Sequence, residues 1–291
     1  LEVILDIDKI HILNLVTTAA GNVGVELPSM IDMASKAIED NKLDRLEALL
    51  TVGLDLDEKN SAGLTLLHSA VSNDNLSALS LLLQHSPNID SRDSDGSSPL
   101  HYGAHVGNLA VISALVDKGA DVDSVDEGEW TPLHVASHNG FTQVVEYLIT
   151  QKAKIAAVDS ERWSALTIAA QRGHAETLKL LIKVGGNVAL KDDLGRTALH
   201  FAAANGHEQC VRELVWSTAN INVRTASGKT PLHGAVMQDQ VGVVEVLIEH
   251  QADIYANDAS GFPASHYLHG DTRKEFSSFV ASVKRKPNGG I

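Results

Sequence analysis

A phrase that returns every 33 residues constrains this chain more than any other feature. The phrase is clearest in the stretch Thr131-Pro132-Leu133-His134, and it recurs over seven occurrences without an insertion or deletion. The position of its first residue is held, in chain order, by Thr65, Ser98, Thr131, Ser164, Thr197, Thr230 and Pro263. Such a period is typical of an array in which each repeat packs only against its neighbours.

The residues of the phrase predict a short helix. A Thr or Ser just before a helix accepts a hydrogen bond from a backbone N–H of the first turn. Pro132 suits the first helical position because it has no N–H to leave unpaired. We expect Leu133 to point into the stack, His134 to bond to the neighbouring repeat, and Gly140 to end the helix.

In seven consecutive repeats, counted from the one with Asp32 at the capping position, a leucine stands 17 residues after that position and predicts a second helix. These leucines are Leu49, Leu82, Leu115, Leu148, Leu181, Leu214 and Leu247. The residue three positions earlier is always Leu, Ile or Val, so that each second helix carries one apolar stripe. The loop that follows, which we call the finger, leads to the next first helix. In Lys118–Asp123 it carries a glycine suited to positive φ and the branched residue Val122, which is expected to anchor it.

This pattern resembles that of the ankyrin-repeat family over residues 30–283, and more faintly over residues 1–29. The resemblance implies an all-α fold, an ankyrin-repeat α-solenoid of helix–turn–helix repeats of 33 residues with β-hairpin fingers, stacked into a curved section. It also implies protein–protein recognition without catalysis. The family's fingers are substrates of asparaginyl hydroxylation, which makes Asn222 a candidate for that modification.

The sequence departs from the family pattern at several turns. Arg162 stands in place of a turn glycine, and Thr167 stands in place of the histidine of the phrase. Finger glycines are replaced at Lys152, Thr218 and Gln251. The sequence therefore does not decide the local conformation of these turns, whereas the expected helices are unaffected.

Five segments are predicted along the chain. Residues 1–29 form a degenerate partial repeat. Residues 30–59 form a degenerate N-terminal repeat, in which other residues replace those of the phrase. Residues 60–257 hold six well-formed repeats, residues 258–283 a C-terminal capping repeat, and residues 284–291 a tail. Because the chain starts with Leu inside a repeat, we expect it to be a piece of a longer protein.

Composition limits the classes of partner. The formal net charge of −14 argues against nucleic acid, whose phosphates require the opposite sign, and favours a partner with a basic surface. The single cysteine, Cys210, cannot form an internal disulfide, which fits the cytosol or the nucleus. The sequence has no run of 18 apolar residues, so we expect no direct membrane insertion. The stack is expected to be monomeric.

The residues with reactive side chains do not suggest an active site. Most of the 14 histidines recur at framework positions. The stretch His207-Glu208-Gln209-Cys210 has Val211 where a zinc protease helix needs its second histidine. The recurrent finger aspartates are expected to cap turns rather than bind metal, and Cys210 is expected to be a packed residue. We therefore predict neither catalysis nor a cofactor or metal.

The positions that the framework leaves free point to a binding groove. In the family, the finger tips and the exposed side of the first helices line a concave surface. Trp130 and Trp163 stand just before the capping residue in consecutive repeats, where nothing in the framework requires tryptophan, and Trp and Arg are frequent interface hot spots. The predicted partner-binding residues are Trp130, Trp163, His105, His138, Asn139, Gln171, Arg172, Glu127, Glu161 and Arg196.

Two alternatives to this groove stay open. The two indoles could simply pack on the backbone of the stack. The outer face, where Trp216 falls near the end of a second helix, could also bind.

The sequence is compatible with two functions. The first is a non-catalytic adaptor or scaffold of the cytoplasm or nucleus that binds a protein partner in the groove. The second is a regulatory or targeting segment of a larger enzyme, channel or secreted effector, whose activity lies outside this chain.

Overall fold

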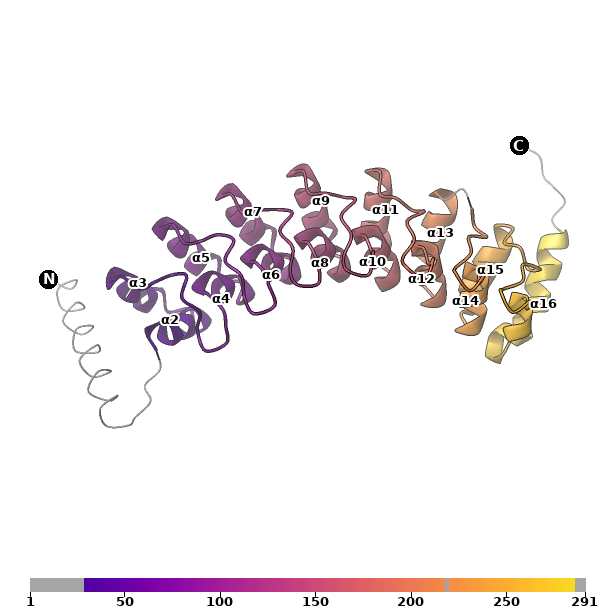
Figure 1. The fold of residues 1–291 in the computed structure, drawn as a ribbon, viewed down its shortest axis with the longest axis horizontal. Coiled ribbons are helices and arrows are strands. Elements are labelled where there is room, and N and C mark those ends of the chain that lie inside the picture. The colour runs from indigo at the N-terminus through magenta and orange to yellow at the C-terminus, as the bar shows by residue number, and fades with distance from the viewer. Residues whose placement is uncertain (1–28, 218–219, 286–291) are drawn as a thin grey trace. The chain divides into compact units, whose positions relative to one another are not determined.

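The computed structural model describes residues 29–217 and 220–285, and it consists of two compact units (Figure 1). Unit 1 is Leu1–Glu127 and unit 2 is Gly128–Ile291. Of the predicted partial repeat, residues 1–28 lie outside the described residues, as do residues 286–291 of the predicted tail.

Unit 1 is a stack of helix pairs. Its first helices are α2 (Met30–Glu39), α4 (Leu66–Ser72) and α6 (Pro99–Val106), and each contacts the next. Its second helices are α3 (Leu43–Thr51), α5 (Leu76–Leu82), which continues as a 3₁₀ turn (Leu83–His85), and α7 (Leu109–Asp117). The first and second helices thus form two layers, which is the arrangement that the 33-residue phrase predicts.

Unit 2 repeats the arrangement. Its first helices are α8 (Pro132–Asn139), α10 (Ala165–Arg172), α12 (Ala198–Ala204), α14 (Pro231–Met237) and a 3₁₀ turn (Ala264–Tyr267). Its second helices are α9 (Thr142–Thr150), α11 (Ala175–Lys183), α13 (Glu208–Ser217), α15 (Val241–Glu249) and α16 (Gly270–Arg285). No helix within residues 29–217 and 220–285 is long and apolar enough to cross a membrane.

A capping residue and a histidine start most of the first helices together. Thr131 has the extended backbone of a helix cap, and its hydroxyl oxygen accepts the N–H of His134 at 3.4 Å. In return, Nδ1 of His134 accepts the Thr131 N–H at 3.0 Å. The same reciprocal pair starts α4, α6, α12 and α14. This arrangement satisfies N–H groups that a helix start otherwise leaves unpaired.

The other nitrogen of these histidines joins neighbouring repeats. In unit 1, Nε2 of His68 donates to the carbonyl of Ser97 at 3.0 Å. In unit 2, Nε2 of His200 donates to the carbonyl of Lys229 at 3.2 Å, and His233 bonds Phe262 in the same way at 3.1 Å. The predicted bond from this histidine to the neighbouring repeat is thereby confirmed.

The second helices bury the predicted leucines. Leu49 is 5% exposed, and the six other leucines of that position are 0% exposed. Small residues in the first helices permit the close packing that this burial requires. A Cβ on Gly103 would lie 3.1 Å from Cγ1 of Ile112. The core of each unit is therefore aliphatic and lies between its two helix layers.

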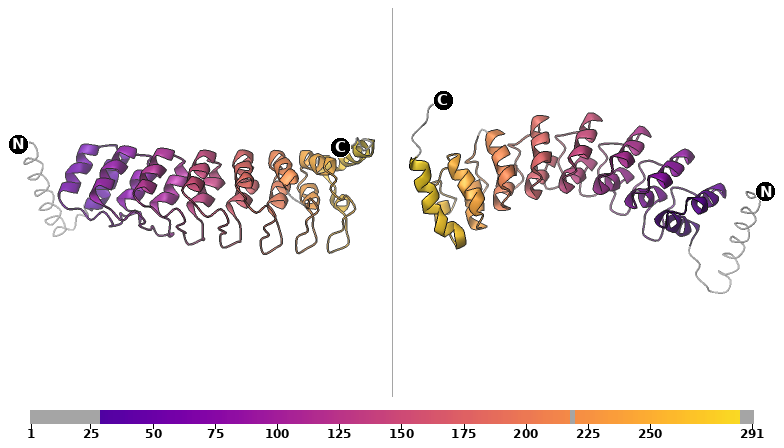
Figure 2. Two further views of the ribbon diagram at one scale, coloured as in Figure 1. Left: turned by 90° about the horizontal axis from the view of Figure 1, so that it is seen from above. Right: turned by 180° about the vertical axis from the view of Figure 1, so that it is seen from behind.

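The fingers contain tight turns, and the β-hairpin form that the family resemblance implies is not confirmed. Within the described residues, β-pairing amounts to two isolated bridges, Val158 with Ser164 and Asn257 with Pro263. An aspartate organises several of these turns: Oδ1 of Asp159 accepts the N–H groups of Glu161 and Trp163 at 3.0 and 2.8 Å. Asp93, Asp192 and Asp258 bind two backbone N–H groups in the same way. The fingers of each unit leave its helices on one side (Figure 2).

The turns that lack glycine keep the glycine conformation. Lys152, Arg162 and Gln251 have φ of 69°, 63° and 64°, in the left-handed region. Glycine has the same conformation at Gly185 (φ 96°), which matches Lys152 and Gln251, and at Gly195 (φ 74°), which matches Arg162. Such a backbone costs a residue with a Cβ roughly 1–2 kcal/mol. The turn shape is therefore imposed by the packing of the repeat. The remaining replaced finger glycine, at Thr218, lies outside the described residues.

Candidate partner-binding surface

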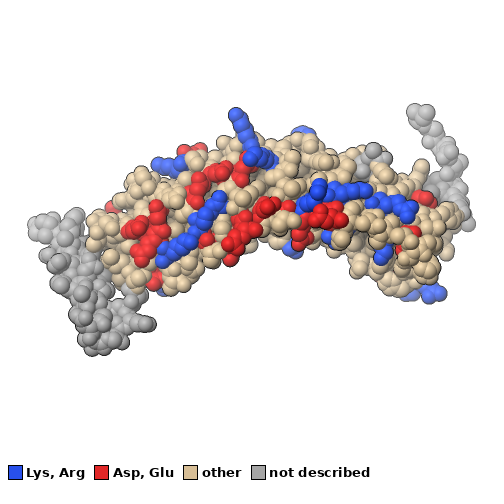
Figure 3. Space-filling view, in the orientation of Figure 1, with Lys and Arg blue, Asp and Glu red and all other residues tan. Residues whose placement is uncertain are grey.

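The negative charge of the chain is concentrated in one unit. Residues 1–127 contain 21 acidic and 7 basic side chains, whereas residues 128–291 contain 16 of each. Basic side chains lie over the part of unit 2 from α12 to α15 in Figure 3. Unit 1 therefore carries a net charge of −14, whereas the formal net charge of unit 2 is zero.

Two of the predicted binding residues belong to unit 1. His105 is exposed in the last turn of α6. Glu127 is exposed in a finger, and its N–H donates to the carbonyl of Asp95 in the preceding finger at 3.0 Å. The other eight belong to unit 2.

Trp130, at the start of unit 2, packs against the first helix that it precedes. Its indole is half-buried, and the ring centroids of Trp130 and His138 are 5.4 Å apart in an edge-to-face arrangement. The His134 ring lies 6.2 Å away. The neighbouring candidate Asn139 donates from Nδ2 to the carbonyl of Val135 at 3.0 Å. This end of the surface therefore consists of side chains already engaged with their own helix.

Trp163 forms a cluster with two residues of the next repeat. Its ring meets Phe201 edge to face, with centroids 4.7 Å apart. Cζ of Arg196 lies 4.5 Å from the Phe201 centroid and 6.0 Å from the Trp163 centroid. Phe201 is 7% exposed, whereas Trp163 is half-buried. We call Trp163, Arg196 and Phe201 the aromatic–arginine cluster.

The indole nitrogen of this cluster lacks a partner. Nε1 of Trp163 is buried and makes no hydrogen bond with the described residues. A buried donor without an acceptor costs about 1–3 kcal/mol. Its neighbour Arg196 is better satisfied, because its Nε lies 2.6 Å from Oδ2 of Asp192, whose side chain is 3% exposed. The cluster thus combines a fixed cation with an unused donor.

The ends of the first helices are joined by histidines of the following repeat. His174 donates from Nε2 to the carbonyl of His138 at 2.9 Å, and His207 does the same to Gln171. Arg172 follows at the last position of α10, where it is exposed and makes no hydrogen bond or ion pair within the described residues. Arg172 is therefore available to a partner.

Glu161 is at the tip of a finger and is exposed. The adjacent Arg162 lies 3.8 Å from Asp193 of the next finger, and both side chains are largely exposed. Such a pair contributes little stability. The finger tips of unit 2 therefore present charges of both signs instead of a continuous acidic fringe.

The outer side of unit 2 also carries exposed aromatics. Trp216 is 80% exposed and stands edge to face with His250, with centroids 5.6 Å apart. The residue that follows His250, Gln251, lines a hollow of about 250 Å³ together with Ile248, Ile254, Tyr255 and Val280. Trp216 is more exposed than the half-buried Trp163, and it remains the alternative binding site.

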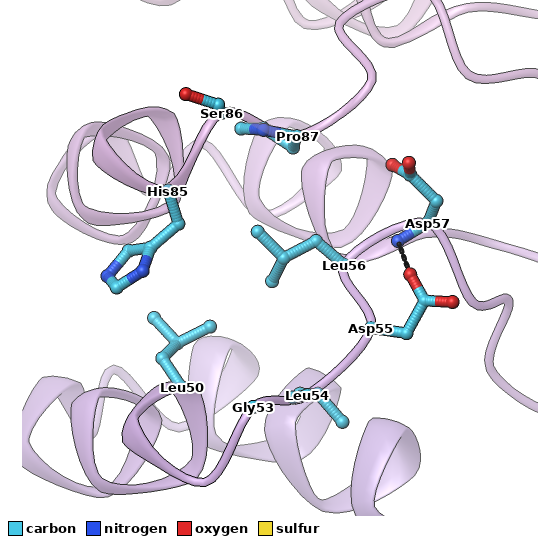
Figure 4. Close-up of a pocket in the computed structure, with 9 residues that line it drawn as sticks. All are labelled: Leu50, Gly53, Leu54, Asp55, Leu56, Asp57, His85, Ser86 and Pro87. Atoms are coloured by element: carbon cyan, nitrogen blue, oxygen red, sulfur yellow. Dashed lines mark hydrogen bonds between the residues drawn. The ribbon is translucent and has the colours of Figure 1, made fainter.

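Unit 1 has a hollow of about 320 Å³ at the same place in the repeat (Figure 4). Leu50, Leu56 and His85 point into it, while the hydroxyl of Ser86 points away. Its two aspartates are engaged in turns: Asp55 accepts the N–H of Asp57, and Asp57 accepts that of Asn88. We assign this hollow a structural origin, because Ser86 and Pro87 stand where Gly119 and Ala120 stand in the next repeat.

Potentially reactive groups are used by the framework. Burial lowers the pKa of His68 and His233, and that of His200 to about 4, so these rings are neutral at pH 7. Burial raises the pKa of the Cys210 thiol to about 11, which leaves it protonated and unreactive. The described part of the chain brings together no group of three His, Cys, Asp or Glu side chains that could hold a metal ion.

One member of the cluster, Phe201, was not among the predicted residues. It lies four residues after the capping position, where Tyr102 and Tyr267 stand in other repeats. Tyr102 and Tyr267 each donate from the hydroxyl to the finger aspartate of their repeat, at 2.8 and 2.6 Å. In the repeat of Phe201, which has no hydroxyl, Arg196 fills this role towards Asp192. The recurrence of large aromatics at this position was the signal in the sequence.

The repeat geometry and the family comparison agree. A model of ankyrin repeats in three copies matches residues 34–126, 121–192 and 176–258. The chain belongs to the ankyrin-repeat family, whose members are generally protein–protein interaction modules. The comparison with curated proteins gave no match.

Proposed function

We propose that this chain is a non-catalytic adaptor or scaffold module that binds a protein partner on the finger side of unit 2. The binding residues would be Trp163, Arg172 and Arg196, with Trp130 and Glu161 at the edges. The observation that carries the proposal is the aromatic–arginine cluster. It is half-buried, rigidly held and rich in the residue types that dominate interface energies.

The framework histidines support a module without catalysis. A catalytic histidine must exchange protons near neutral pH. In the framework histidines, Nδ1 instead accepts a backbone N–H at a helix cap and Nε2 donates to a carbonyl of the next repeat, as in His200. Their role is to hold repeats together.

Unit 1 would contribute through charge. Its excess of acidic side chains would steer a partner with a basic surface towards it, mainly by raising the association rate. His105 and Glu127 would belong to that contact. A reducing compartment, the cytoplasm or nucleus, fits a module whose single cysteine is a buried thiol.

Affinity capture from a cell lysate tests the proposal. The bait is the full chain, as wild type and as the double variant Arg172→Ala with Arg196→Ala. The matched control is Lys179→Ala with Lys183→Ala, which removes two exposed charges from α11, a second helix. Circular dichroism and thermal unfolding establish that each bait is folded.

Partners of the finger side should be lost with the arginine variant and kept with the lysine control. Equal loss with both variants would indicate non-specific electrostatic capture. Equal retention of every partner by the arginine variant and the wild type would refute the assignment to this surface.

A further inference from the structure

The position of Arg196 is fixed by a buried carboxylate. Oδ1 of Asp192 accepts the backbone N–H groups of Leu194 and Arg196 at 3.0 and 2.7 Å. Its Oδ2 accepts Nε of Arg196 at 2.6 Å. One residue therefore shapes the finger and also orients the guanidinium, so that the direction of Arg196 follows from the turn itself.

Aromatic rings support the same guanidinium. Cζ of Arg196 lies 4.5 Å from the ring centroid of Phe201 and 6.0 Å from that of Trp163. A guanidinium held against aromatic rings is stabilised by the ring quadrupoles. It has also lost most of its rotational freedom before a partner arrives. Binding through this group consequently costs less entropy than binding through a free arginine.

Among the described residues, the terminal amino groups of Arg196 meet no hydrogen-bond acceptor. Arginine has five N–H donors, and the Nε donor is the single one that is hydrogen-bonded among the described residues. The side chain is 36% exposed. Two nitrogens that point in fixed directions form the fork that matches the two oxygens of a carboxylate.

The surrounding charges favour an anion with one negative charge. Lys229 occupies the position of Arg196 in the next repeat. It is also basic, so it adds to the attraction for an acidic group. Asp192 already neutralises part of the Arg196 charge, and Asp193 is 75% exposed on the same finger. These two carboxylates would repel a doubly charged phosphate more strongly than a carboxylate.

We propose that Arg196, oriented by Asp192 and supported by Phe201 and Trp163, binds the carboxylate of an Asp or Glu side chain in an acidic segment of the partner. This inference rests on the proposed function and names the chemistry of its ligand. An acidic ligand at unit 2 differs from the basic partner surface that the net charge of the chain favours. The two can belong to one partner, because the negative charge is concentrated in unit 1.

Peptide selection tests this inference. Random nine-residue peptides displayed on phage are selected against the wild-type full chain. Enriched peptides are then measured by fluorescence anisotropy against wild type, Arg196→Ala, Arg196→Lys and Trp163→Phe. The exposed Lys183→Ala serves as the control variant. Each enriched acidic residue is also replaced by its amide, which removes the charge and keeps the shape.

The expected result is enrichment of Asp or Glu at one peptide position. Replacing that residue by its amide should weaken binding to wild type at least 10-fold, yet hardly at all to Arg196→Ala. Arg196→Lys should bind with intermediate affinity, because an ammonium has the charge without the fork. Trp163→Phe keeps an aromatic ring beside Arg196 and removes an Nε1 that is already buried, so it should bind the peptide nearly as well as wild type.

The contrary results separate the two proposals. Peptides that depend on Arg196 or Trp163 but carry no acidic residue would overturn the carboxylate assignment and keep the binding surface. Peptides whose binding is unchanged in Arg196→Ala would also overturn it, as would a selection that enriches nothing. The lysate capture with the double arginine variant then decides on its own whether this surface binds proteins.

Discussion

Nδ1 of His200 lies 3.0 Å from the hydroxyl oxygen of Thr197 and accepts the Thr197 backbone N–H at 3.1 Å. Because Nδ1 is an acceptor, the imidazole proton is on Nε2, which faces the carbonyl of Lys229. Protonation of His200 would place the second proton on Nδ1, which could then no longer accept the Thr197 N–H. The geometry thus ties the start of α12 to a neutral histidine.

Acid should therefore weaken the fold well before carboxylates titrate. The pKa of His200 is lowered by burial from 6.5 to about 4, so the unfolded chain takes up the proton first. The stabilising contribution is complete above pH 6.5 and is lost as the pH falls towards 4, by roughly 3 kcal/mol in total. Urea unfolding at pH 7.5, 6.0 and 5.0 measures this loss. His200→Gln should be less stable at pH 7.5 and show a shallower pH dependence, whereas an unchanged dependence would contradict the assignment.

Trp163 should serve stability through its ring and not through its nitrogen. Trp163→Ala removes the contact with Phe201 and should lower the free energy of unfolding by about 2–3 kcal/mol, less than a fully buried Trp would cost. Trp163→Phe keeps an aromatic ring and removes the unpaired N–H, so its effect should be much smaller. Chemical denaturation of both variants provides the measurement. Equal losses would mean that Nε1 has an acceptor.

At the left-handed turns, introducing a glycine and removing one should change the free energy of unfolding in opposite directions. Lys152→Gly should raise the free energy of unfolding by about 0.5–1 kcal/mol, because glycine adopts φ of 69° without a Cβ clash. Gly185→Ala should lower it by about 1–2 kcal/mol. A Cβ on Gly185 would meet nothing within 4 Å, so this cost would come from the backbone conformation alone. Thermal unfolding of the two variants tests the pair, and the same sign for both would be inconsistent with it.

The ion pair of Asp192 and Arg196 should be energetically coupled. A double-mutant cycle with Asp192→Asn and Arg196→Gln is expected to give an interaction of about 1 kcal/mol, since the carboxylate is 3% exposed. The control cycle uses Asp271 and Lys274, which are 2.5 Å apart but 67% and 72% exposed. Such a pair should show no measurable coupling. Equal couplings in the two cycles would argue against a special role for burial.

The helices could be predicted from the sequence because one rule repeats. The capping residue, the buried leucine 17 positions later and the histidine between repeats occupy fixed places, and each has a local physical cause. The turns at Lys152 and Arg162 could not be predicted in this way, because their backbone is imposed by the stack against the preference of the residue. The β-hairpin form of the fingers, inferred from the family, was not confirmed, since the described residues show two isolated antiparallel bridges.

The candidate site was predictable only in part. Trp163 and Arg196 stood out because the framework does not require them. Their mutual contact through Phe201 depends on side-chain directions across two repeats, which the 33-residue register does not contain. The role of Asp192 was recognised as a turn cap, whereas its second oxygen, which orients Arg196, was not foreseen.

The hydrogen bonds between repeats have a consequence for synthesis. His200 and Lys229 are 29 residues apart, and His174 and His138 are 36 residues apart. The chain entropy lost in closing such a loop is therefore nearly the same for every repeat, and it grows only slowly with loop length. Each new repeat can find its partners as soon as it leaves the ribosome, because the surface that it needs was made immediately before it. Folding can follow translation from one end to the other without waiting for the last residue.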